Sequence, residues 1–212
     1  MLLKHMIKLS MNGKESHWKY ISNIKSIFTN RGLDDVMFRD EANWYSTFVS
    51  VSNDQREKLF FERMTACKSL IYYNKMKKHM RLENYLKNDR DFYGARLKFL
   101  ARSNNFSLES HFQAWGMSDG NCKFCNKNEF ESLIHRLLIC PHFNVERTTF
   151  YNNVSLKCHP GIASHILESS NEVKILLLLG DDVNLDWGHA QWTILDRLVK
   201  RYLISIFKPL CK

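Results

Sequence analysis

The sequence predicts a mostly α-helical protein, folded as a helical bundle. The 212 residues include only three prolines and eight glycines, which suits helices better than a turn-rich sandwich or barrel. In several segments, apolar side chains recur every three or four residues, the spacing of an amphipathic helix. Alternation typical of strands is weak throughout. A short β-hairpin is expected in one place only, where it could hold Cys122 and Cys125.

Three helices are expected in the N-terminal part of the chain. The first includes residues 18–28 and is closed by Asn30-Arg31-Gly32, a typical end signal. The second covers about 38–49. Ser52-Asn53-Asp54 can cap a third helix, which runs from about 55 to 77 with apolar residues on one side.

The remaining helices follow from similar signals. Asn88-Asp89 precedes a basic helix that reaches about Ser103, whereas residues 106–120 are expected to be irregular. Further helices are predicted at 129–139, 144–154, 172–179 and 188–207. We therefore divide the chain into an N-terminal helical region (1–88), a basic helix with a cysteine-rich segment (89–155) and a C-terminal helical region (156–212).

The cysteine-rich segment has the spacing C-x2-C-x9-H-x4-C. Its members are Cys122, Cys125, His135 and Cys140, two close pairs within nineteen residues. Thiolate sulfur and imidazole nitrogen are ligands that Zn²⁺ prefers, and Cys3His is one of its standard structural sets. A metal site with four protein ligands has no position for a reacting water, so a structural role is favoured. We expect a small Cys3His zinc knuckle embedded in the bundle.

Several alternatives remain open from the residues alone. A C-x2-C pair can be a redox pair, although no strand–motif–helix setting is visible here. Cys158, His159 and His142 are spare candidate ligands, while Cys67 and Cys211 are interpreted as ordinary thiols. Gly180-Asp181-Asp182 matches the metal-binding turn of some RNA polymerases, but a helix stop followed by a polar loop explains it better.

The charge of the chain is uneven. The formal net charge is +9, and residues 56–102 hold thirteen Lys and Arg against five Asp and Glu. A basic block beside a zinc site favours a polyanionic partner, most simply nucleic acid. The alternative is a solvated helical face that contacts no polyanion.

Residues 97–147 resemble the zinc-binding region that follows the reverse transcriptase domain in polyproteins of non-long-terminal-repeat (LINE-type) retrotransposons. The resemblance rests on the C-x2-C pair followed by Glu129 and Glu131, then His135 and a Cys-Pro, and lastly Phe143 and Arg147. No polymerase palm and no restriction-like nuclease pattern accompany the motif. The chain therefore resembles a detached or degenerate tail of such a polyprotein.

This resemblance implies a non-catalytic module that binds RNA or DNA with weak sequence preference. It also implies phosphate contacts from eight basic residues, namely Lys75, Lys77, Lys78, Arg81, Arg90, Arg96, Lys98 and Arg102. Tyr93, Phe124 and Phe143 could stack on bases, although a core position is the simpler expectation for each. The rival interpretation is a structural or protein-interaction module that zinc stabilises and that binds no nucleic acid.

The sequence also sets expectations about enzymatic activity and location. No P-loop, nucleophile elbow or zinc-protease motif occurs, so we expect neither an enzyme nor a small-molecule substrate. Met1–Leu9 lacks the apolar core of a signal peptide, and the longest apolar run, 175–179, is too short to span a bilayer. An intracellular setting, nuclear or cytoplasmic, is expected, and it would keep thiols reduced.

Overall fold

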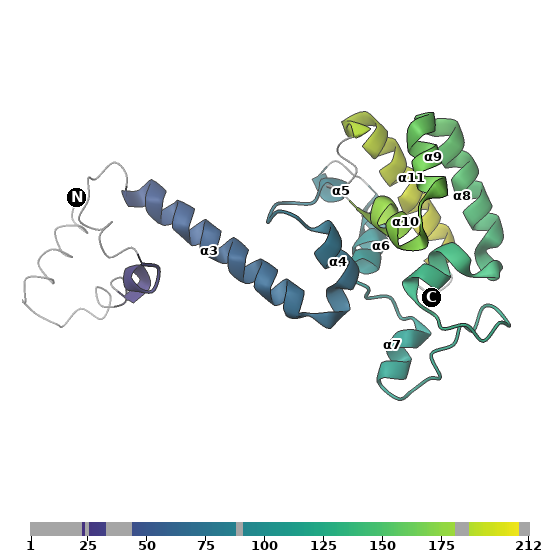
Figure 1. The fold of residues 1–212 in the computed structure, drawn as a ribbon, viewed down its shortest axis with the longest axis horizontal. Helices are drawn as coiled ribbons and strands as arrows, with labels where there is room; N and C mark the ends of the chain where they lie inside the picture. Colours follow the sequence, from purple (N-terminus) through teal and green to yellow (C-terminus); the bar gives the residue numbers. More distant parts are fainter. Residues whose placement is uncertain (1–22, 24–25, 33–43, 88–90, 181–186, 208–212) are drawn as a thin grey trace, which may run out of the picture. The chain divides into compact units, whose positions relative to one another are not determined.

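The computed structural model describes residues 23, 26–32, 44–87, 91–180 and 187–207. Most of these residues are helical and none belongs to a named strand, so the predicted mostly α-helical fold is confirmed (Figure 1). The chain forms two compact units, residues 1–62 and 63–212. The boundaries predicted at 88/89 and 155/156 both lie within the second unit.

The first unit is held together, where it is described, by aromatic contacts. The rings of Phe28 and Phe48 are stacked with centroids 5.0 Å apart, and the Arg31 guanidinium lies 5.4 Å from the Phe48 ring centre. Gln55 donates a hydrogen bond to the Arg31 carbonyl. Residues 26–29 are helical, whereas most of the helix predicted at 18–28 lies outside the described residues.

Helix α3 (Trp44–Ala66) replaces two helices that the sequence predicts. The expected cap, Ser52-Asn53-Asp54, lies inside this continuous helix. Ser, Asn and Asp each cost well under about 1 kcal/mol in a helix interior, so three of them do not force a break. The actual end comes at Cys67, whose backbone is extended, and not near residue 77. Residues 38–43 of the predicted second helix lie outside the described residues.

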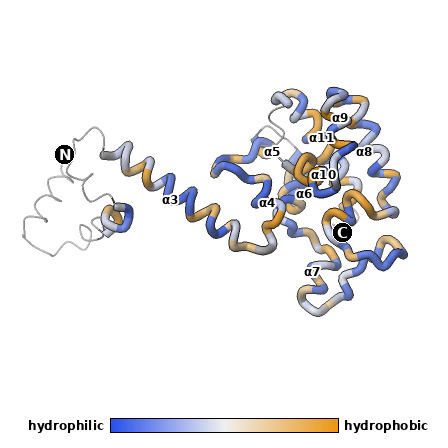
Figure 2. Tube along the Cα trace, in the orientation of Figure 1, coloured by the Kyte–Doolittle hydropathy of each residue, from blue (hydrophilic) through white to orange (hydrophobic). Residues whose placement is uncertain are grey.

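The core of the second unit is built around α11 (His189–Phe207). This helix packs against α6 (Phe92–Arg102), α8 (Asn144–Lys157) and α10 (Asn171–Leu179). Figure 2 shows α10 as a strongly hydrophobic segment, and four of its apolar side chains are buried. The chain segment that holds the cysteines is anchored to this bundle through α8.

A glycine allows α6 to approach α11 closely. A Cβ atom added at Gly94 would lie 2.8 Å from the Cβ of Lys200 and 2.5 Å from a carboxylate oxygen of Asp91. Asp91 caps α6, because its side chain accepts a hydrogen bond from the backbone N–H of Gly94. The close approach places the basic residues of α6 beside the polar residues of α11.

Shorter helices complete the second unit. They are η2 (Lys68–Leu70), α4 (Ile71–Met76), α5 (Asn84–Lys87), α7 (Glu109–Ala114), η3 (His135–Ile139), η4 (Pro141–Phe143) and α9 (Pro160–Glu168). Two of these correct the sequence analysis, since α7 lies in a stretch expected to be irregular and α9 was not predicted. The start signal of α9 is present in the sequence: Pro160 occupies the first turn, and the His159 ring accepts a hydrogen bond from the N–H of Gly161.

The predicted hairpin is reduced to one isolated antiparallel bridge between Asn121 and Phe130 within the described residues. No helix among the described residues has the length and apolar character needed to cross a membrane.

Candidate metal centre

A tight loop positions the first cysteine pair. The N–H of Cys122 donates to the carbonyl of Glu129 (2.9 Å), and the N–H of Glu131 donates to the carbonyl of Gly120 (2.9 Å). These bonds close a loop at whose end Gly120 adopts φ +81°, in the left-handed region that favours glycine. An added Cβ there would also approach the Gln113 side chain to 2.9 Å. The loop therefore holds Cys122 and Cys125 without strands of any length.

A π-helical turn positions the second pair. Helix is predicted from residue 129, but it begins at Leu133 and widens into η3 (His135–Ile139). The N–H of Cys140 donates to the carbonyl of His135, five residues earlier, at 2.7 Å. Pro141 then starts η4, which leads into α8. The turn brings His135 and Cys140 to the same side of the chain, facing the loop.

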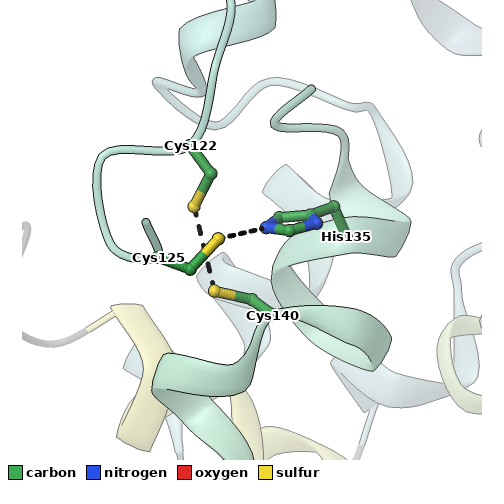
Figure 3. Close-up of side chains that lie close together, drawn as sticks. All are labelled: Cys122, Cys125, His135 and Cys140. Carbon is green, nitrogen blue, oxygen red and sulfur yellow. Dashed lines mark hydrogen bonds between the residues drawn. The ribbon is translucent and has the colours of Figure 1, made fainter. Parts of the chain in front are cut away.

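All four side chains converge on one point (Figure 3). Their ligand atoms lie within 4.8 Å of one another, and all four residues are buried. The Cys122 and Cys140 sulfurs are 3.8 Å apart, and the Cys125 sulfur is 3.5 Å from Nε2 of His135. The predicted convergence of these residues is confirmed, and together they could hold a metal ion.

A carboxylate orients the histidine. Nδ1 of His135 lies 3.0 Å from an oxygen of Glu129, on the ring edge opposite to the nitrogen that faces Cys125. A partner on one ring nitrogen fixes the tautomer and directs the other toward a metal, an arrangement common among metal-binding histidines. The backbone N–H of His135 is bonded to the Ser132 hydroxyl, which fixes the start of the turn.

A second carboxylate connects the first cysteine to a buried arginine. Glu131 is buried and lies 3.7 Å from the Cys122 sulfur, while it also accepts bonds from Arg136 and from the Glu109 backbone N–H. The Arg136 guanidinium lies 3.9 Å from the centre of the Phe124 ring. This packing explains why Phe124 and the buried Phe143, which is 5.3 Å from the same guanidinium, belong to the core. The pair of Glu131 and Arg136 is neutral as a unit.

Positive charge also lies beside the fourth ligand. The buried Arg147 donates from Nη2 to the carbonyl of Cys140 at 2.9 Å. Burial raises the pKa of the Cys122 thiol to about 12, and it raises the pKa of Cys140 as well, because apolar surroundings disfavour a thiolate. A divalent cation opposes this effect, since metals bind the thiolate form.

The spare candidate ligands do not join the cluster. Within the described residues, the group of potential ligands comprises only the four predicted positions. His142 is exposed and packs against the Phe124 and Phe143 rings, while the ring of His159 caps α9. Cys158 is buried at the end of α8.

Three of the eight basic residues expected to contact phosphates are buried instead. Lys77, Lys98 and Arg102 are 6%, 1% and 0% exposed. Lys77 and Arg102 pair with Glu83 at 2.6 and 3.0 Å, and Lys98 pairs with Asp196 at 2.5 Å. Asp196 is shared with the buried Lys200 at 2.7 Å. We call these six residues the buried ion cluster.

The other basic residues are differently placed. Lys75, Lys78, Arg81 and Arg96 are exposed. Arg90 and the aspartates of Gly180-Asp181-Asp182 lie outside the described residues. Sequence reasoning missed the buried ion cluster because Lys98 and Asp196 are 98 residues apart and nothing in the sequence marks Glu83 as the partner of Lys77 and Arg102. It named Glu129, Glu131 and Arg147 only as members of a pattern, without the roles beside the cysteines that the structure gives them.

Comparisons with known proteins leave this centre as the main indication of function: no protein family, no curated protein and no solved structure matches the chain.

Proposed function

We propose that this protein is a non-catalytic, zinc-containing nucleic-acid-binding module. The observation that carries the proposal is the convergence of Cys122, Cys125, His135 and Cys140. A tetrahedral Zn²⁺ with sulfur at about 2.3 Å and nitrogen at about 2.0–2.1 Å separates two sulfurs by about 3.8 Å, and sulfur from nitrogen by about 3.6 Å. Here the Cys122 and Cys140 sulfurs are 3.8 Å apart, and the Cys125 sulfur is 3.5 Å from Nε2 of His135.

The charges around the centre fit a divalent ion with three thiolates. Such a complex carries a net charge of −1, and a buried charge requires a compensating neighbour. Arg147 supplies this compensating positive charge, since it donates a hydrogen bond to the Cys140 carbonyl. Arg136 balances the negative charge of Glu131. Four protein ligands complete the coordination of Zn²⁺, which supports a structural role. Native mass spectrometry of the purified protein would identify the ion.

The basic block supports the nucleic-acid part of the proposal, with a smaller set of residues than the sequence indicates. Lys75, Lys78, Arg81 and Arg96 remain as exposed phosphate contacts. The resemblance to the tails of LINE-type retrotransposon polyproteins rests on the cysteine motif, and under this proposal the chain is a detached or degenerate tail that binds RNA or DNA with weak sequence preference.

Filter binding to a single-stranded RNA and to duplex DNA at several salt concentrations tests the proposal. Affinity should fall as salt rises. Each phosphate that the protein neutralises steepens the plot of log affinity against log salt concentration by about 0.7–0.9. The double change Lys75→Gln and Lys78→Gln should make the slope shallower. Lys157→Gln, an exposed residue at the end of α8, serves as the matched control. Affinity that does not respond to salt would contradict phosphate binding.

An interaction module is the second candidate, and exposed apolar side chains favour it. Trp115 and Met117 follow α7 and are both mostly exposed. Such side chains mark protein contacts when they gather on one surface. Recovery of a protein partner that survives nuclease treatment, together with no nucleic-acid binding, would support this alternative.

A further inference from the structure

The outer face of α6 carries an unusual combination of side chains. Phe92 is 88% exposed and Phe99 is 47% exposed, and Arg96 lies between them in the sequence. The spacings of four and three residues place all three on one side of the helix. A nearly fully exposed phenylalanine is costly unless something covers it. This face is therefore a candidate contact surface.

Two hollows flank the face, and Arg96 lines both. The first measures ≈ 330 Å³, and its lining includes Phe92, Phe99, Tyr85 and Leu86. The second measures ≈ 380 Å³, and its lining includes Asn105, Ser107 and Phe207. One guanidinium thus stands between an apolar, aromatic hollow and a more polar one.

Charge decides which kind of ligand suits this surface. Among the described residues, no Asp or Glu lines either hollow, and Arg96 is the charged residue in both linings. Behind the first hollow, the Tyr85 ring centre lies 5.1–5.8 Å from the cationic groups of Lys98, Arg102 and Lys200, which are buried and paired with Asp196 and Glu83. The surface itself therefore combines aromatic rings with the positive charge of Arg96, which matches a ligand that has flat rings and a negative backbone.

We propose that the α6 face formed by Phe92, Arg96 and Phe99 binds single-stranded nucleic acid. The backbone phosphate pairs with Arg96, and unpaired bases stack on the two phenylalanines and enter the hollows on either side. Single strands use such stacking platforms because every base has a flat face, whereas the bases of a duplex are already stacked on one another. This inference rests on the proposed function and assigns its contact surface and preferred strand form.

The test uses the full-length protein with a fluorescein-labelled oligothymidylate and, separately, a labelled duplex of the same length. Phe92→Leu keeps an apolar side chain but removes the ring, so it separates stacking from simple hydrophobic contact. We expect Phe92→Leu and Phe99→Ala each to weaken single-strand binding by about tenfold, within the range of one base–aromatic stack, and to change duplex binding much less. Arg96→Gln should lower the salt slope for the single strand by about 0.7.

Matched controls are available on other surfaces. Trp115→Ala removes an exposed aromatic ring next to α7, and Arg201→Gln removes an exposed guanidinium on α11. Both should leave single-strand affinity within about twofold of wild type. Circular dichroism melts should match for all five variants, because every altered side chain is at least partly exposed.

The outcomes separate the two proposals. A wild-type protein that binds neither probe overturns the proposed function, and this inference with it. Salt-dependent binding that the α6 variants do not change more than the controls do overturns the α6 site but leaves the proposed function standing. Equal losses on single strand and duplex overturn the single-strand preference.

Discussion

The second unit holds two buried polar centres that are built in opposite ways. The metal centre draws its four ligands from nineteen consecutive residues, on a loop and the turn that follows it. The buried ion cluster draws on positions from Lys77 to Lys200, and its pair of Lys98 and Asp196 spans 98 residues of sequence. One centre organises its own segment, whereas the other joins α6 and α11 after the chain has folded.

This difference determines what each centre contributes. Ligands that are close in the sequence can bind an ion before the bundle forms, and binding can order the segment. The ion cluster exists only once the helices are packed, and burial makes each of its charges dependent on a partner. We therefore expect loss of the metal to affect the fold locally, and loss of a charge in the cluster to affect the whole second unit.

Metal loss should produce the largest change, confined to one segment. Structural Zn²⁺ is worth about 10–16 kcal/mol in small peptides. Chelation, or the substitution Cys125→Ser, should accelerate amide hydrogen exchange in residues 115–145 while α11 stays protected. Cys158→Ser, a buried cysteine outside the centre, should keep stoichiometric metal. Uniform loss of protection across the unit would remove the distinction between the two centres.

Removal of the shared carboxylate should destabilise the whole unit. Asp196→Ala leaves Lys98 and Lys200 buried without that carboxylate, and breaking a buried ion pair costs about 3–5 kcal/mol. Urea unfolding followed by circular dichroism measures this loss, with metal content recorded in parallel.

Arg197→Ala, at the exposed neighbouring position on α11, is the control and should cost less than about 0.5 kcal/mol. Asp196→Asn should fall between the two, because the amide keeps one hydrogen-bond acceptor. A stability for Asp196→Ala equal to that of the control would show that the cluster does not join the helices.

The smallest expected effect concerns the orientation of the histidine. Glu129→Gln removes the carboxylate that lies 3.0 Å from Nδ1 of His135, and loss of such a partner lowers metal affinity about 10- to 100-fold. Competition with a chromophoric chelator measures the affinity. Lys127→Gln, exposed in the same loop, should leave it unchanged. If both variants bind the metal equally tightly, the backbone alone orients the His135 ring and Glu129 does not.

The two centres also show which features a sequence can reveal. The convergence of the four candidate metal ligands was predictable, because a spacing of a few residues is a direct constraint on geometry. The positions of Lys77, Lys98 and Arg102 were not, since their carboxylate partners Glu83 and Asp196 give no sign of pairing in the sequence. A lysine on a basic helix has the same appearance in the sequence whether it faces solvent or a buried aspartate.

Helix boundaries were likewise predicted well only where the sequence signal extends over many residues. The long helix α11 was predicted within a residue of its start, because its apolar spacing continues over many turns. The helix break predicted at Ser52-Asn53-Asp54 is absent. The capping preference of three residues is too weak to interrupt a helix that continues on both sides of them. The widened turn η3 had no signal in the sequence, because apolar spacing does not distinguish a π-turn from an α-turn.

That widened turn makes the alignment of the last two ligands depend on the path of the backbone. Between His135 and Cys140, the exposed Ile139 can change without altering that path. In an ordinary α-helix, residues five apart differ by about 140° around the axis, so the last thiol would point away from the histidine. Homologous chains that keep this interval should therefore keep the widened turn, together with the buried Arg136 and Leu137.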